Sequence, residues 1–164
     1  MKKIASFTVD HNKLDPGVYI SRIDGDVITY DIRVKKPNQG DYLSNPALHT
    51  IEHLFATYAR NSELSDSVIY FGPMGCRTGF YLLLRDSVSK KRALTLIQDT
   101  FEFIQNYSGE IPGSDKKECG NYLEHDLYSA KEEAKEYLKV ITNLTDNDLE
   151  YETNQRRINN VGIS

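Results

Sequence analysis

The chain has 164 residues, a formal net charge of −4 and a sequence pI near 5.6. This acidic balance argues against non-specific nucleic-acid binding, which depends on a concentrated basic face. The length suits one folded domain, and 39% hydrophobic with 27% charged residues is typical of an ordered globular protein. No apolar run approaches the roughly 20 residues that span a bilayer, and the N-terminus lacks the apolar region of an export signal, so we expect a cytoplasmic protein.

The N-terminal part of the chain predicts a β-hairpin. Residues 17–34 contain two runs rich in Val, Ile and Tyr, joined at residues 24–26 by Asp-Gly-Asp, a strong turn signal. Apolar side chains of the second run alternate with Thr29, Asp31 and Arg33. Because side chains alternate between the faces of a strand, we expect these three to be free to meet solvent or a ligand.

The rest of the chain predicts helices interleaved with two more strands. Asn45-Pro46 is a good helix start, with Asn45 as N-cap and Pro46 in the first turn. We expect helices over residues 46–60, 88–107 and 126–141, and strands over residues 67–71 and 79–85. Since the strands arrive as hairpin partners, the predicted class is α+β, an antiparallel β-sheet packed against α-helices, with residues 1–150 as a single domain and residues 151–164 as a polar C-terminal tail.

The first helix carries His49, Glu52 and His53 beside an apolar stripe. A spacing of four places both imidazoles on one helical face, where two nitrogens can reach one ion at about 2.0–2.1 Å. Glu52 lies beside that face and can serve as a general acid or base without being a ligand. The alternative is a core helix with two hydrogen-bonded histidines. We expect the metal site to lie on this sheet-packed helix.

Two histidines do not complete a catalytic metal site, which usually has three protein ligands and an open position. The candidates for the third ligand are Cys119, His125, His11, Cys76 and several carboxylates. A thiolate at Cys119 is attractive because it binds soft divalent metals well, but His125 competes with it or caps the following helix. Residue spacing does not choose between them.

Cys76 lies in the predicted loop between two strands, flanked by Gly75 and Arg77. An adjacent guanidinium or metal lowers the pKa of a thiol toward reactivity, whereas the alternative is a small buried residue in a tight turn. The pattern His-x-x-Glu-His over residues 49–53 also matches inverted zinc peptidases. A small metallohydrolase is therefore an alternative function, although it does not explain Cys76. A non-catalytic metal-binding domain is a further alternative.

Five stretches of the sequence together resemble the S-ribosylhomocysteine lyase (LuxS) family. They occur in the order and at about the spacings of that family, and they cover nearly the whole chain up to about residue 150. The stretches are SFTVDHN (6–12), DIRVKKPN (31–38), HTIEHLFA (49–56), PMGCRTGFYL (73–82) and ECGNYLEHDLYSAK (118–131). Before Pro-Met-Gly-Cys the chain departs from the common Ile-Ile-Asp-Ile-Ser of the family, because residues 68–72 read Val-Ile-Tyr-Phe-Gly.

The resemblance implies a cytoplasmic homodimer with active sites at the subunit interface and one divalent metal per subunit. Fe(II) is the expected metal, zinc or cobalt can replace it, and no organic cofactor is needed. The residues that match family positions fall into three groups. The implied metal ligands are His49, His53 and Cys119, the acid/base residues are Glu52 and Cys76, and the substrate-binding residues are Ser6, His11, Arg33 and Arg60, some of them from the neighbouring subunit.

The reaction implied by the resemblance cleaves the thioether of S-ribosyl-L-homocysteine. Its products are L-homocysteine and 4,5-dihydroxy-2,3-pentanedione, the precursor of autoinducer-2, so the family is linked to quorum sensing and to homocysteine metabolism. The expected route is a series of carbonyl shifts through enediolates followed by β-elimination.

Overall fold

The computed structural model describes residues 1–151, and residues 152–164 of the expected tail lie outside the described residues. The regular elements follow the predicted order. They are the strands β1 (Gly17–Asp24), β2 (Val27–Arg33), β3 (Val68–Pro73) and β4 (Gly79–Arg85), the helices α1 (Asn45–Arg60), α2 (Lys90–Asn106) and α3 (Leu127–Ile141), and the short 3₁₀ turns η1 (Ala5–Phe7), η2 (Ser65–Ser67) and η3 (Asp146–Asp148).

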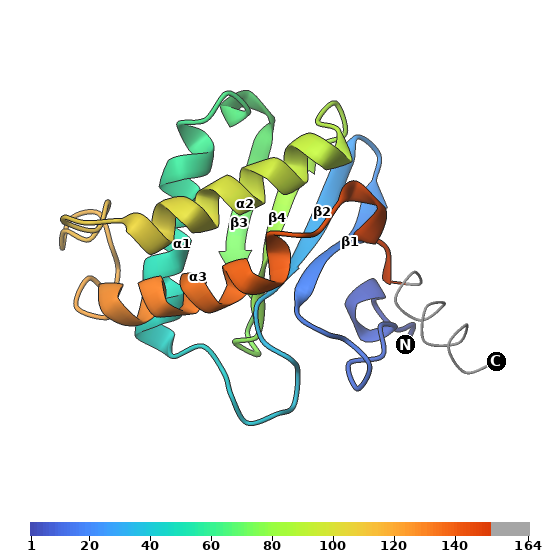
Figure 1. Ribbon diagram of the computed structural model, residues 1–164, viewed down its shortest axis with the longest axis horizontal. Coiled ribbons are helices and arrows are strands. Elements are labelled where there is room, and N and C mark those ends of the chain that lie inside the picture. Colours follow the sequence, from blue (N-terminus) through green and yellow to red (C-terminus); the bar gives the residue numbers. More distant parts are fainter. Residues whose placement is uncertain (152–164) are drawn as a thin grey trace.

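The four strands form one antiparallel sheet in the order β1-β2-β4-β3. The β1–β2 turn is tight because Gly25 adopts a φ of +60°, a left-handed conformation that glycine tolerates best. Helices α2 and α3 cross in front of the sheet, and α1 lies beside β3 (Figure 1). The predicted α+β class, with an antiparallel sheet packed against helices, is confirmed.

The core lies between the sheet and the helices. On β2 and β4 the side chains of Tyr30, Ile32, Phe80 and Leu82 are fully buried, and Phe55 of α1 stacks on a ring of β3. Burying such side chains stabilises the fold by about 1.5–3 kcal/mol each. This packing fixes α1 against the sheet, so the opposite face of α1 is held in one orientation.

Helix α1 begins with a different cap from the one predicted. Ser44 occupies the N-cap position, and its hydroxyl oxygen accepts a hydrogen bond from the backbone N–H of Ala47 at 3.2 Å. The prediction of Asn45 as N-cap is therefore wrong by one residue. Both residue types cap helices well, and the hydrogen bond to Ala47 decides the register.

The second face of β2 does not meet solvent as expected. Asp31 and Arg33 are only 1% and 3% exposed, and they form an ion pair in which the guanidinium Nη2 lies 2.7 Å from a carboxylate oxygen. The prediction is wrong for contact with solvent, because neighbouring side chains cover the pair, but Arg33 still lines an open pocket.

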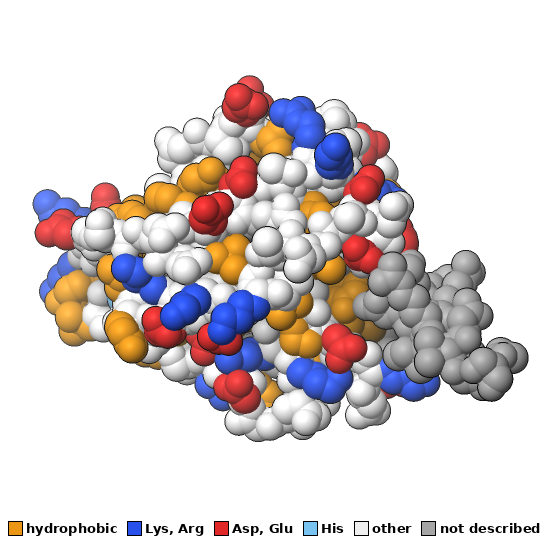
Figure 2. Space-filling model, in the orientation of Figure 1, with side chains coloured by type: hydrophobic (Ala, Val, Ile, Leu, Met, Phe, Trp, Pro, Cys, Tyr) orange, Lys and Arg blue, Asp and Glu red, His pale blue; other side chains and the backbone are white. Residues whose placement is uncertain are grey.

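On the face of the molecule that carries α2 and α3, acidic and basic side chains are interspersed (Figure 2). Such a mixed surface lacks the concentrated basic patch that nucleic-acid binding requires. Among residues 1–151, no helix is long and apolar enough to cross a bilayer.

Candidate functional site

The two histidines of α1 are oriented by backbone carbonyl groups. Nδ1 of His49 lies 2.8 Å from the carbonyl oxygen of Glu124, and Nδ1 of His53 lies 2.8 Å from that of Pro112. A carbonyl oxygen only accepts hydrogen bonds, so Nδ1 must be the protonated nitrogen in both rings. Each Nε2 therefore keeps a free lone pair, which is the arrangement that a metal-ligating histidine needs.

The thiol of Cys119 lies close to both of these Nε2 atoms. Its Sγ lies 3.4 Å from Nε2 of His49 and 4.0 Å from Nε2 of His53. Metal–sulfur and metal–nitrogen bonds of the lengths found for zinc, arranged tetrahedrally, would separate sulfur from nitrogen by about 3.6 Å. The chemistry and the spacing of these three donors fit a divalent transition metal, so the structure brings together the three ligands that the resemblance implied.

The loop between α2 and α3 is shaped to bring Cys119 to the histidines. Backbone N–H of Cys119 donates to the carbonyl of Asp115 at 3.0 Å, and the Asp115 side chain accepts from the N–H of Lys117 at 2.8 Å. Gly113 has a φ of +69°, and a Cβ at this position would lie 3.2 Å from Nδ1 of His53. Glycine therefore suits this position, because it tolerates the left-handed backbone and leaves room for the nearby imidazole.

His125 is the fourth member of the cluster, whose ligand atoms all lie within 4.8 Å of one another. Its ring stacks on that of His49 with centroids 4.0 Å apart, and its Nδ1 lies 3.0 Å from the hydroxyl oxygen of Thr50. Burial, with smaller contributions from His49 and His53, lowers the pKa of His125 to about 4, so this ring is neutral at pH 7.

The hydrogen bonds of His125 differ from those of the other two histidines. The hydroxyl oxygen of Thr50 accepts a hydrogen bond from the N–H of Asp126 at 3.0 Å and lies 3.0 Å from Nδ1 of His125, to which a hydroxyl can either donate or accept. Nε2 of His125 is buried and has no hydrogen-bond partner among residues 1–151, so the geometry leaves His125 open as a fourth donor of the cluster. Asp126, rather than His125, is the N-cap of α3.

The acid/base candidate on α1 is Glu52. It is partly exposed and lies three residues after His49, on a neighbouring part of the same helical face, beside the cluster.

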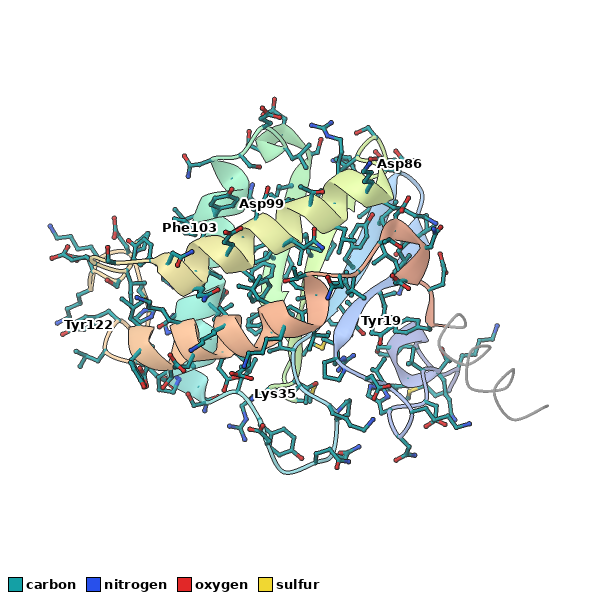
Figure 3. The ribbon with its side chains drawn as sticks, viewed as in Figure 1. Tyr19, Lys35, Asp86, Asp99, Phe103 and Tyr122 are labelled. Carbon is teal, nitrogen blue, oxygen red and sulfur yellow. The ribbon has the colours of Figure 1, made fainter. Side chains whose placement is uncertain are left out.

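The loop that carries Cys119 is at one end of the molecule, where Tyr122 is labelled in Figure 3, and Tyr19 of β1 lies toward the opposite side.

Most of the other predicted site residues line an open pocket of about 660 Å³. Ser6, His11, Arg33 and Cys76 line it, but none of the four cluster residues is among the described residues that do so. Arg60 lies elsewhere, at the end of α1, where its guanidinium donates to the carbonyls of Val68 and Ile69 at 3.4 and 3.1 Å.

Cys76 is exposed in the turn between β3 and β4, as expected for a reactive residue. Its Sγ lies 3.0 Å from the hydroxyl oxygen of Thr78, which also accepts a hydrogen bond from Nη1 of Arg33 at 2.8 Å. Burial alone would lower the pKa of Arg33, but attraction to Asp31 and the hydrogen bond between them raise it above its ordinary value. A permanent positive charge is therefore held beneath Cys76.

The sequence reasoning missed Thr78 and Tyr151. Thr78 lies two residues after Cys76, but the segment is a turn in which Arg77 adopts a φ of +60°, so strand alternation could not indicate their contact. The hydroxyl of Tyr151 donates to the Asp31 carboxylate at 2.6 Å, although 120 residues separate the two in the sequence. No local pattern could have indicated that contact.

The chain is similar to known proteins over most of its length. The family model described as S-Ribosylhomocysteinase (LuxS) matches residues 4–148. The S-ribosylhomocysteine lyase of Borreliella afzelii is 50% identical over 156 residues, which cover 92% of this chain and 99% of that protein. The enzyme of the same name from Phocaeicola vulgatus is 48% identical over 161 residues, covering 94% of this chain and all of that protein. The resemblance that the five sequence stretches indicated is thereby confirmed, and the chain belongs to the S-ribosylhomocysteinase (LuxS) family.

Proposed function

We propose that the protein is a metal-dependent carbon–sulfur lyase that cleaves S-ribosyl-L-homocysteine into L-homocysteine and 4,5-dihydroxy-2,3-pentanedione. The observation that carries the proposal is the occurrence, in one chain of this family, of a His/His/Cys donor set and an exposed Cys76 above a buried guanidinium. A hydrolase that uses Glu52 to activate water would have no use for Cys76.

The proposed chemistry follows from the substrate. A thioether is a poor leaving group until a carbonyl lies β to it, so the ribose carbonyl must move from C1 to C2 and then to C3. Each shift passes through an enediolate and moves protons between adjacent carbons. β-Elimination then expels the homocysteine thiolate.

Two groups of residues share this work in the proposal. His49, His53 and Cys119 hold one divalent ion, with Fe(II) as the expected metal and zinc or cobalt as replacements. The ion, when bound, supplies Lewis-acid stabilisation of negative charge on oxygen. Glu52 and Cys76 take protons from the sugar carbons and return them, which requires that they approach the sugar from different sides.

The pocket residues are proposed to hold the substrate. Ser6, His11 and Arg33 line the same pocket as Cys76, which supports a common role for them. For Arg60 the described contacts are those to two β3 carbonyls, so its proposed substrate contact rests on the family match alone.

We further propose a cytoplasmic homodimer, built from a single domain over residues 1–150, in which the two halves of the site come from different protomers. The pocket lined by Cys76 and the metal cluster are separate within one chain. The sheet face that α2 and α3 leave uncovered is flanked by apolar side chains, since Ile4, Phe7 and Tyr70 are 56%, 69% and 54% exposed. A second copy on this face would bury them and bring a pocket toward a cluster.

The direct experiment mixes Fe(II)-loaded protein with S-ribosylhomocysteine under anaerobic conditions and follows the release of free thiol. We expect one thiol per molecule of diketone, which a 1,2-diamine traps as an absorbing product. A protein that contains its metal and releases no thiol would overturn the lyase proposal. Hydrolysis of a peptide library by the same sample would favour the metallohydrolase alternative instead.

A further inference from the structure

The buried ion pair beneath the pocket has a third member, contributed by the C-terminal end of the described chain. The hydroxyl of Tyr151 donates to Oδ2 of Asp31 at 2.6 Å, and Nη2 of Arg33 donates to the same oxygen at 2.7 Å. One carboxylate oxygen thus receives both donors. Hydrogen bonds to a charged group are stronger than those between neutral groups, particularly where water is excluded.

Tyr151 is itself held in a fixed position. Its ring stacks on that of Tyr19 with centroids 4.9 Å apart and an interplanar angle of 18°. Two residues earlier, the fully buried Leu149 accepts a hydrogen bond from the N–H of Ile20 at 2.7 Å. The end of the described chain is therefore attached to β1 by backbone and ring contacts.

The ion pair has few other contacts that could hold it. Among residues 1–151, neither Oδ1 of Asp31 nor Nε of Arg33 has a hydrogen-bond partner, although both atoms are buried. Within the described part of the chain, the guanidinium of Arg33 hydrogen-bonds two side chains, Asp31 through Nη2 and Thr78 through Nη1. The direction of the guanidinium therefore depends on where Asp31 is held.

We propose that Tyr151 is a positioning residue, which holds the Asp31 carboxylate and thereby aims the guanidinium of Arg33 at Thr78 and Cys76. This inference rests on the proposed function, because Arg33 is assigned there to substrate binding. Without the Tyr151 hydroxyl, Oδ2 of Asp31 loses one of its two donors while remaining buried. A carboxylate left short of donors turns toward new ones, and Arg33 turns with it.

The test uses Tyr151→Phe, which keeps the ring on Tyr19 and removes only the hydroxyl. The readout is the ratio of the rates at which anionic iodoacetate and neutral iodoacetamide of the same size alkylate Cys76, measured by peptide mass spectrometry on the metal-loaded full-length protein at fixed pH. Because a guanidinium near the sulfur attracts only the anion, displacing Arg33 should lower this ratio about threefold at low salt. His11 and Arg77 remain in every protein compared.

Tyr137→Phe is the matched control. Tyr137 is also buried, but its hydroxyl donates to the carbonyl of Gly17 at 2.6 Å and not to the ion pair. We expect Tyr137→Phe to leave the ratio unchanged. In the thiol-release assay, Tyr151→Phe should lower kcat/KM about 10-fold, as expected for a misplaced binding group, and Tyr137→Phe should not.

Two results would overturn the inference. One is an unchanged alkylation ratio in Tyr151→Phe protein whose near-UV circular dichroism is native, and the other is an equal fall in Tyr137→Phe, which would indicate general loosening. If Tyr151→Phe does not fold, Tyr19→Leu, which removes the ring on which Tyr151 stacks, decides: a smaller fall in the ratio supports the inference, and no fall overturns it. The two proposals fail separately. A wild-type protein that releases no thiol would refute the proposed function. The ratio of alkylation rates would still test the role of Tyr151, because alkylation of Cys76 needs no turnover.

Discussion

The metal cluster and the Cys76 pocket are built in different ways. In the cluster, backbone carbonyls orient both histidines of α1, and one loop supplies the thiol of Cys119, so the donor set is complete within one chain. The pocket is open and is lined by residues of the N-terminal segment 6–11, of the loop after β2 and of the β3–β4 turn. A buried ion pair lies beneath Cys76. In the proposed dimer, metal binding should therefore depend on one protomer, and proton transfer on how the two protomers meet.

The sharpest test of this difference compares the two cysteines. Cys119→Ala should abolish both metal content and turnover, because a soft ligand is removed from a set of three. Cys76→Ala should lower turnover by about 10³-fold or more while the metal content stays at one ion per chain, because a proton carrier is removed and no ligand is. Metal analysis of anaerobically purified proteins, together with the thiol-release assay, checks both outcomes.

The two cysteine variants also define how the comparison would fail. Loss of metal from Cys76→Ala would mean that Cys76 belongs to the ligand set. Full metal content in Cys119→Ala would move the third ligand to His125, the fourth member of the cluster.

Mixed dimers test whether the pocket and the cluster come from different protomers. Glu52→Gln and Cys76→Ala should each be inactive as homodimers. If one site uses Glu52 of one chain and Cys76 of the other, random reassortment gives half mixed dimers with one intact site each, so activity should return to about a quarter of the wild-type value. If both residues serve one site from the same chain, the mixture should stay as inactive as its parents.

The difference between the regions also explains what could be predicted from sequence. His49, Glu52 and His53 lie within five residues on one helix, and helical geometry alone places them together. The choice between Cys119 and His125 was beyond spacing, because the fold brings both side chains to the two histidines and all four ligand atoms lie within 4.8 Å of one another. The resemblance to a family made that choice; the residues alone left it open.

The strands of the sheet could be predicted from the sequence, but the residues that cover its second face could not. The alternation along β2 placed Asp31 and Arg33 on the face away from the core. Whether that face is exposed depends on what packs over it, and Tyr151 comes from the far end of the chain. Contacts of this sequence separation follow from the fold as a whole and leave no local pattern.

Gly113 offers a test of how rigidly the cluster is built. In Gly113→Ala the new methyl group would meet His53, since a Cβ there lies 3.2 Å from Nδ1, and the φ of +69° would be strained. We expect metal affinity to fall about 10-fold, a typical result of disturbing the groups that orient a ligand. Competition with a metal-binding dye measures the affinity.

Gly40→Ala is the control for Gly113→Ala. Gly40 has a similar φ of +75°, but a Cβ there would meet nothing within 4 Å. Each substitution should lower the free energy of unfolding by about 1 kcal/mol through backbone strain, and only Gly113→Ala should weaken metal binding. An equal loss of affinity in both variants would mean that general destabilisation, and not contact with His53, is responsible.

The smallest expected effect concerns the start of α3, next to the cluster. The side chain of Asp126 caps this helix, and hydrogen bonds from the N–H and the hydroxyl of Ser129 lower its pKa. A carboxyl with a lowered pKa in the folded state stabilises the protein above its unfolded pKa, and this stabilisation is lost as the pH falls through the folded value. Urea unfolding should show that Asp126→Ala costs about 1 kcal/mol at pH 7, whereas Asp126→Asn, an uncharged cap, costs less. The advantage of wild type over Asp126→Asn should shrink at pH 3, and an advantage as large there as at pH 7 would mean that the charge of the cap contributes nothing.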